Sequence, residues 1–209
     1  NSGYVKASHK VLSSISKEYE FSEVEINKLR YIAGCAKLLH SPPVLPISPN
    51  PIKPKSKTKR VLYVAASSRP YHYNGYTSRT HGIVKGIMEH GWDVLCVTRP
   101  GYPEDRHDRS PGEEVIYTVR EHDGVQYQAL KGPHRRNIPL DEYLYRSAEV
   151  LVEKARTYQA SIIHAASNYE ASLPALLAAK KLGLKFIYEV RGPVSYTHLR
   201  AHETGRNLV

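Results

Sequence analysis

Two apolar runs that are typical of buried strands end in polar side chains that could bind or activate a hydroxyl group. His164 and Asn168 lie at the end of one run, and Glu189 and Arg191 close another. A histidine at a strand end could hydrogen-bond a sugar hydroxyl or transfer a proton, or it could be a structural residue with satisfied hydrogen bonds. Glu189 and Arg191 are two positions apart and so point to the same side of a strand. They could orient substrate hydroxyls or form a plain ion pair.

A glycine just before a predicted helix marks the loop after the first apolar run. Gly75 precedes this helix, and Arg79 lies four residues farther on. Backbone N–H groups at a helix N-terminus favour an anion, and a glycine lets the backbone approach a ligand closely. The alternative is that Gly75 only makes the turn. The loop has neither the GxGxxG pattern of a dinucleotide binder nor the Gly-Lys-Ser/Thr of a phosphate-binding P-loop.

A metal cofactor is not expected. The two cysteines, Cys35 and Cys96, lie far apart within apolar patterns, which favours buried free thiols in a reducing cytoplasm. No cluster of histidines and cysteines has the spacing of metal ligands in the chain up to residue 192.

The elements that would position these residues alternate between strands and helices. Continuous apolar runs predict strands at 61–66, 92–98, 161–165 and 185–190. Helices are expected around 83–88, 144–155 and 172–183, the last capped by Ser172 with Pro174 in its first turn. Two further β-rich runs, 115–119 and 125–130, flank a turn signal at Asp123-Gly124.

Strands separated by helices of this length indicate βαβ units. We therefore expect an α/β fold, a Rossmann-like parallel sheet with helices on both faces. Ligands of such sheets bind beyond the carboxyl ends of the strands. This rule points to the loops 67–79, 98–106 and 165–172 and to the chain from residue 191 onward.

A helix and a Pro-rich linker precede this body. Ser22 and Glu25 have the spacing of a capping box, and a helical apolar stripe then reaches about residue 40. Six prolines between residues 41 and 57 predict a semi-rigid extended linker, so we expect the helix to be a separate element whose partner is lost or unknown. The expected division is a helical segment at 1–40, the linker at 41–58, a Rossmann-like domain at 59–192 and a tail at 193–209.

The sequence pattern of the tail differs from that of the rest of the chain. Residues 194–209 have neither helical nor strand periodicity and resemble the translation of a sequencing-library adapter. On this interpretation His198 and His202, whose spacing mimics a metal site, carry no meaning. Together with an initial Asn1, the tail predicts a fragment that is open at both ends.

The formal net charge of +10 is partly concentrated just before the first predicted strand, where five basic residues lie between positions 53 and 60. A basic surface can attract nucleotide sugars or anionic lipid surfaces, or it can be only a solvated linker on a mildly basic domain. No motif of a nucleic-acid-binding fold is present, so a nucleic-acid partner is not expected. We expect a cytoplasmic protein, with peripheral membrane contact as an option.

Taken together, four segments resemble the N-terminal domain of family-4-type glycosyltransferases of the GT-B fold. They are residues 75–82, 97–103, 163–168 and 188–192, and the resemblance extends over 59–192. In that family two Rossmann-like domains face each other across a cleft. The N-terminal domain holds mainly the acceptor, and the C-terminal domain grips the nucleotide of the sugar donor.

The resemblance implies roles for single residues. Gly75 would lie below the donor phosphates, Arg79 and Asn168 would bind substrate, and Glu189 and Arg191 would lie beside the acceptor cleft. His164 is the only candidate catalytic residue. Many members have a second histidine two positions later, where this chain has Ala166, and this departure puts a direct role of His164 in doubt.

The implied function is retaining transfer of a hexose from a nucleotide sugar to a hydroxyl acceptor of glycan or glycolipid type, as in polysaccharide biosynthesis. The nucleotide sugar would be a co-substrate, with no other cofactor, and the acceptor-side domain alone is expected to be inactive. The alternatives are a sugar-nucleotide epimerase or another Rossmann-like enzyme, and a non-enzymatic basic interaction module. The sequence leaves the donor sugar and the acceptor open.

Overall fold

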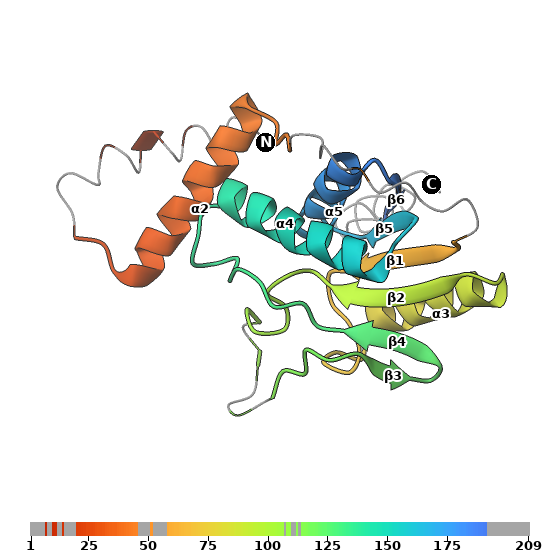
Figure 1. Cartoon of the computed structure of the whole chain (residues 1–209). Helices are drawn as coiled ribbons and strands as arrows, with labels where there is room; N and C mark the ends of the chain where they lie inside the picture. Colours follow the sequence, from red (N-terminus) through yellow and green to blue (C-terminus); the bar gives the residue numbers. More distant parts are fainter. Residues whose placement is uncertain are drawn as a thin grey trace, which may run out of the picture.

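The computed structural model describes most of the chain between residues 20 and 191 (Figure 1). Described are residues 20–45, 51, 58–106, 108–109, 112 and 114–191, with the single residues 7, 10, 11 and 14 before them. Much of the Pro-rich linker and the whole segment 194–209 that resembles a translated adapter lie outside the described residues. The domain limits therefore stay predictions.

A six-stranded sheet forms the centre of the described chain. Its strands are β1 (Arg60–Ala65), β2 (Asp93–Thr98), β3 (Arg120–His122), β4 (Val125–Gln128), β5 (Ile162–Ala166) and β6 (Lys185–Glu189). They lie in the order β3-β4-β2-β1-β5-β6, and every neighbouring pair is parallel except the β3–β4 hairpin. The predicted α/β fold with a mainly parallel sheet is confirmed.

Helices cover both faces of this sheet (Figure 1). Helices α4 (Leu140–Tyr158) and α5 (Tyr169–Leu182) pack on one face, and α3 (Gly75–Glu89) packs on the other. Along β1, Leu62 and Val64 belong to the first core, whereas Tyr63 belongs to the second. Because successive side chains of a strand alternate between its faces, a strand covered on both faces is continuously apolar.

The predicted helix before the linker is α2 (Glu23–His40). The capping box is present, since the Ser22 hydroxyl accepts from the backbone N–H of Glu25, and the Glu25 carboxylate accepts from the backbone N–H of Ser22. These two bonds satisfy backbone donors that a helix start would otherwise leave open.

The expectation that α2 is a separate element with a lost or unknown partner is corrected, because α2 packs on α4. The described apolar residues at this contact are Tyr31, Cys35 and Leu38 of α2 with Leu140, Tyr143 and Leu144 of α4. The helices meet closely at Gly34, where a Cβ atom would lie 2.3 Å from the backbone nitrogen of Leu140. The first turns of α4 present an apolar surface to α2, a feature that a helical stripe alone does not reveal.

The β-rich stretch in the middle of the chain is partly corrected. The turn at Asp123-Gly124 is confirmed, with φ values of 55° and 75° that suit a two-residue hairpin. Strand β4 agrees with the second predicted run, but the first strand is Arg120–His122 rather than 115–119. Side chains hold the earlier backbone instead, since the Tyr71 hydroxyl bonds both backbone groups of Ile116 at 3.0 and 3.2 Å.

Helix α5 begins earlier than expected. Its cap is Asn168, whose side chain accepts from the backbone N–H of Ala171, and the Ser172 hydroxyl instead donates to the Asn168 carbonyl. Pro174 consequently lies in the second turn. Both Asn and Ser are good capping residues, so the local sequence did not distinguish the two starts.

Neither cysteine forms a disulfide, and the two differ in burial. Cys96 is buried as expected, and burial raises the pKa of its thiol, whereas Cys35 is only half-buried. No helix among the described residues has the length and apolar character needed to cross a membrane.

Candidate functional site

A hollow of about 360 Å³ opens where the carboxyl ends of β1, β2 and β5 meet. We call it the strand-edge cavity. Its lining comes from three chain segments and one further residue. The loop after β1 and the start of α3 supply Ala66, Ser67, His72 and Tyr76, and the chain after β2 supplies Arg99, Tyr102, Arg106 and Asp108. The end of β5 supplies Ser167 and Asn168, and Arg135 is the remaining lining residue. These are three of the loops that the sheet rule singled out, so the predicted ligand edge does carry a cavity.

A chain of three polar side chains lies along this cavity. His72 Nε2 is 2.9 Å from Asp108 Oδ2, and the Tyr102 hydroxyl is 2.8 Å from His72 Nδ1. The hydroxyl also lies 3.5 Å from the Ser68 carbonyl. A neutral imidazole would donate to Asp108 and accept from Tyr102, and a protonated one would donate at both nitrogens while Tyr102 donates to Ser68. Both ring nitrogens of His72 therefore have a polar partner.

The carboxylate of Asp108 is kept ionised within this chain. Hydrogen bonds from Arg106, at 3.0 Å from Nε to Oδ1, and from His72 hold the pKa of Asp108 well below its usual range. An ionised Asp108 is a strong acceptor for the N–H of the His72 ring. The cavity wall thus contains a fixed negative charge that orients the His72 ring.

Ser167 lines the cavity in a rare backbone conformation. Its φ is 80°, in the left-handed region that a residue with a side chain adopts at a cost. Strand β6 holds it there, since the Ser167 N–H donates to the Glu189 carbonyl at 3.2 Å and the Tyr188 hydroxyl donates to the Ser167 carbonyl at 2.6 Å. The turn directs the chain from β5 into the Asn168 cap of α5.

A buried ion-pair network borders the cavity at Arg99 and Arg135. Arg99 donates from both terminal nitrogens to Asp105, each at 2.6 Å, and the Tyr143 hydroxyl lies 3.3 Å from the same guanidinium. Burial would lower the pKa of Arg99, but Asp105 outweighs burial and holds that pKa above its ordinary value. Arg135 lies 3.7 Å from Asp105 and also pairs with Glu170. The network fixes the chain after β2 against α4 and α5.

Glu189 and Arg191 form the second polar cluster, on the α3 side of the sheet. Arg191 donates to the Glu189 carboxylate at 2.9 and 3.2 Å and to the hydroxyl of Tyr63 at 3.0 Å. It also donates to the Tyr76 carbonyl and the Thr80 hydroxyl of α3. Burial would raise the pKa of Glu189, but the bonds from Arg191 and Tyr63 outweigh burial and lower it. The sequence left two interpretations of Glu189 and Arg191 open, orientation of substrate hydroxyls and a plain ion pair. Within the described residues the ion pair is formed.

His164 lies next to this cluster rather than in the strand-edge cavity. Its ring centroid is 4.5 Å from that of Tyr63, and its Nε2 is 3.7 Å from Glu189 Oε2 without a hydrogen bond. Burial lowers the pKa of His164, which favours the neutral ring. The role of His164 in catalysis stays a prediction.

The remaining predicted residues fall in different places. Arg79 joins the cluster, with its Nε 3.4 Å from Glu189 Oε1, and its side chain is 59% exposed. Gly75 is the first residue of α3, and a Cβ atom there would have no neighbour within 4 Å. Asn168 lines the cavity while it caps α5. Among the described residues, no three His, Cys, Asp or Glu side chains gather as metal ligands would.

Sequence reasoning missed the residues that line most of the cavity, above all His72, Tyr102 and Asp108. The loops that contain them were predicted to face a ligand, but His72 and Asp108 are 36 positions apart and their contact depends on two loop conformations. The one usable signal was the dense run of aromatic and polar residues before Gly75.

A known protein family matches most of this chain. The family model for the glycosyl transferase 4-like domain matches residues 74–208, a range that covers α3 through β6 and continues past the described residues. No protein of curated function matches the chain.

Two solved structures are similar to the chain at low identity. Sucrose-phosphate synthase from Thermosynechococcus elongatus is 12% identical, with a TM-score of 0.38 over 68% of this chain and 67% of that chain. MurG from Acinetobacter baumannii is 16% identical, with a TM-score of 0.39 over 68% of this chain, which spans 39% of the MurG chain. The family model matches more than half of the sequence, and the chain therefore belongs to the glycosyl transferase 4-like domain family.

Proposed function

We propose that this domain holds the hydroxyl acceptor in a sugar transfer from a nucleotide-sugar donor. Two observations support the proposal: membership of the glycosyl transferase 4-like family and the strand-edge cavity at the carboxyl ends of β1, β2 and β5. Its lining of hydroxyl, amide, imidazole and guanidinium groups suits a polyhydroxylated ligand, because each can donate or accept a hydrogen bond.

The observation that carries most weight is the Tyr102–His72–Asp108 chain in the cavity wall. A hydroxyl acceptor must be held with its oxygen directed at the sugar as the new glycosidic bond forms. Both nitrogens of His72 are engaged, so we assign His72 and Asp108 a role in positioning the acceptor. Fixed geometry of this kind lowers the barrier of a two-substrate reaction.

The finer features belong to the same proposal. Transfer would retain the configuration of the sugar, and a second Rossmann-like domain would grip the nucleotide and stabilise the leaving diphosphate. Gly75 at the N-terminus of α3 would face the diphosphate, since a helix N-terminus and an open approach favour an anion. No metal is required in this scheme, and a cytoplasmic protein with peripheral membrane contact is consistent with it.

A mass-spectrometric screen tests the proposal. The gene product that contains this chain is incubated with a panel of nucleotide hexoses and hydroxyl acceptors, and products are searched for the added mass of a hexose. We expect transfer by the unchanged protein and a loss of about tenfold to a hundredfold in His72→Gln, since misplaced reactants can cost that much. Isomerised nucleotide sugar without transfer would instead identify an epimerase.

His90→Gln is the matched control for His72→Gln. His90 is an exposed histidine at the end of α3 whose Nδ1 bonds only the Gly86 carbonyl. Its substitution should leave transfer unchanged. Equal activity of the two variants would contradict the assigned role of the cavity.

A further inference from the structure

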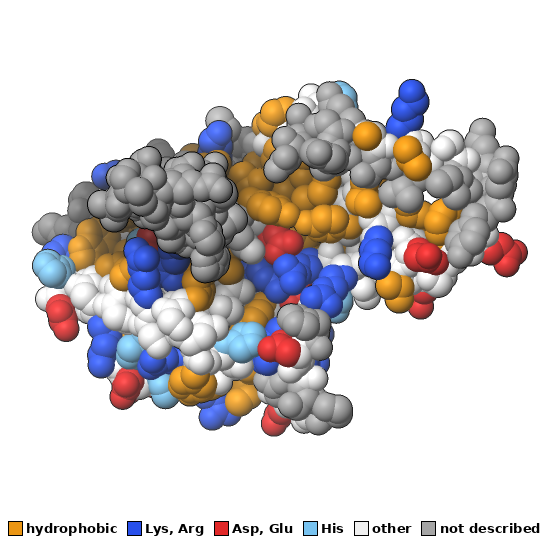
Figure 2. All heavy atoms as spheres, turned by 180° about the vertical axis from the view of Figure 1, so that it is seen from behind, with side chains coloured by type: hydrophobic (Ala, Val, Ile, Leu, Met, Phe, Trp, Pro, Cys, Tyr) orange, Lys and Arg blue, Asp and Glu red, His pale blue; other side chains and the backbone are white. Residues whose placement is uncertain are grey.

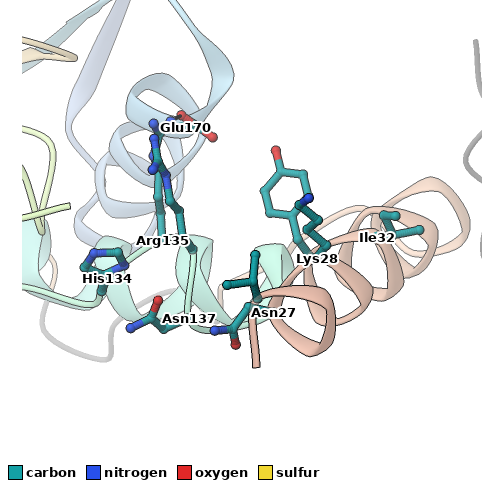
Figure 3. Close-up of a pocket in the computed structure, with 10 residues that line it drawn as sticks. Asn27, Lys28, Ile32, His134, Arg135, Asn137 and Glu170 are labelled. Atoms are coloured by element: carbon teal, nitrogen blue, oxygen red, sulfur yellow. Dashed lines mark hydrogen bonds and ion pairs between the residues drawn. The ribbon is translucent and has the colours of Figure 1, made fainter. Parts of the chain in front are cut away.

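A second and larger hollow, of about 730 Å³, lies between α2, the loop 134–137 and the start of α5. We call it the α2 groove. In Figure 3, Asn27, Lys28 and Ile32 come from α2 on one side, His134, Arg135 and Asn137 come from the loop on the other, and Glu170 lies above Arg135. Its size is within the range of roughly 300–1,000 Å³ that is usual for small-molecule sites.

The α2 wall of the groove is one continuous helix face. Its residues are spaced as i, i+3, i+4, i+7 and i+8 from Val24, the spacing of neighbours on a helix surface. Val24, Tyr31 and Ile32 supply apolar and aromatic surface, and Val24 is 65% exposed. The packing on α4 uses the neighbouring face around Gly34 and shares only Tyr31 with the groove face, so among the described residues no helix covers the rest of that face.

Cations line both walls of the groove. Three basic residues line the groove, Lys28, Arg135 and Arg136, against the single carboxylate of Glu170, which pairs with Arg135. Within the described chain, Lys28 and Arg136 have no carboxylate at ion-pair distance, and both are exposed. Seen from behind, an apolar area lies between α2 and the body of the molecule, with basic side chains along its border (Figure 2).

We propose that the α2 groove binds the apolar chain of an anionic amphiphile, with the head group held between Lys28 and Arg136. The apolar face of α2 matches an alkyl chain, and the two cations without a carboxylate partner match a phosphate or carboxylate head. Tyr31 lines the groove as well, and its hydroxyl lies 2.6 Å from that of Tyr169.

The place of the groove suggests what the amphiphile is for. Arg135 lines both the α2 groove and the strand-edge cavity, so the two hollows adjoin at this side chain. Identification of the amphiphile as the sugar acceptor rests on the proposed function. Binding itself does not, and it is measured without any sugar donor.

Titration calorimetry with single-chain alkyl phosphates below their micelle concentrations tests the binding. We expect saturable binding of dodecyl phosphate, and a tightening of about fourfold for each methylene from octyl to dodecyl while the chain still enters the groove. Dodecyl maltoside should bind more weakly because its head is neutral, and inorganic phosphate should bind more weakly because it has no chain.

Paired variants locate the site. Val24→Asp places a carboxylate on the groove lip, and Arg136→Ala removes a cation, so each should weaken dodecyl phosphate about tenfold or more. Leu39→Asp, at a 47% exposed residue of α2 outside the groove, and Lys131→Ala are the matched controls and should bind normally. Circular dichroism checks that α2 remains folded in each variant.

Several results would overturn the proposal. They are absence of saturable binding, inorganic phosphate binding as tightly as dodecyl phosphate, or a failure of Val24→Asp and Arg136→Ala to weaken binding relative to their controls. Binding of anionic lipid vesicles without binding of the monomeric amphiphile would identify a membrane surface as the partner instead. Each of these outcomes leaves the sugar-transfer screen unaffected, so failure of this inference is distinct from failure of the proposed function.

Discussion

The buried Arg99–Asp105 pair offers the sharpest test of how the cavity is held in place. Asp105 is fully buried and accepts two hydrogen bonds of 2.6 Å, and the side chain of Arg99 is 5% exposed. Asp105→Asn keeps the shape of the side chain but removes its charge. Arg99 then loses its buried countercharge and one of its two acceptor oxygens, while the Tyr143 hydroxyl remains 3.3 Å away.

An uncompensated buried charge costs roughly 3–5 kcal/mol, and we expect Asp105→Asn to lower the free energy of unfolding by about this amount. The matched control is Asp93→Asn, because Asp93 pairs with Arg60 at 3.3 Å while the two side chains are 55% and 38% exposed. An exposed pair contributes less than about 1 kcal/mol. Urea unfolding followed by circular dichroism measures both variants.

Two further comparisons separate the charge from other effects. Added salt should weaken the contribution of the exposed pair but not that of the buried pair. The double variant Arg99→Met with Asp105→Leu should regain much of the stability that Asp105→Asn loses, because it removes both buried charges. Equal costs for Asp105→Asn and Asp93→Asn would refute the reasoning.

Three other predictions concern α2, the cavity lining and pH. Gly34→Ala should cost about 1–3 kcal/mol and expose α2 to protease, because its Cβ would meet the backbone of Leu140; unchanged cleavage would contradict the packing. Ser167→Gly should raise stability by about 0.5–1 kcal/mol, since glycine tolerates the φ of 80°, and thermal unfolding with a lower midpoint would contradict it. Burial lowers the pKa of His164, so its contribution to stability should be present above about pH 6.5 and be lost as pH falls below it. Urea unfolding at pH 7.5 and 5.5 should show a smaller difference for His164→Asn than for the unchanged protein, and an equal difference would be evidence against a neutral buried ring.

Local signals predicted the fold well where one residue pattern has one structural meaning. The apolar runs of β1 and β2 require cover on both faces, and Asp123-Gly124 provides the positive φ values of a tight hairpin. The Ser22 and Glu25 pair marked the start of α2. The start of α5 was misplaced because Asn168 and Ser172 are both able to cap a helix, and the choice depends on how the chain leaves β5.

The candidate site was predicted at the level of loops rather than of side chains. The sheet rule indicated the carboxyl ends of the strands, where the strand-edge cavity lies. It could not pair His72 with Asp108 or Arg99 with Asp105, because these contacts depend on loop conformations that no periodic pattern encodes. The docking of α2 on α4 was missed for a similar reason, since an apolar stripe does not name its partner.

Hydrogen exchange with the acceptor found by the transfer screen tests the central claim most directly. If the strand-edge cavity holds the acceptor, amides in the loops after β1, β2 and β5 should exchange more slowly when acceptor is bound, and those of the β3–β4 hairpin should not change. Unchanged exchange in those three loops, with protection elsewhere in the chain, would contradict the account.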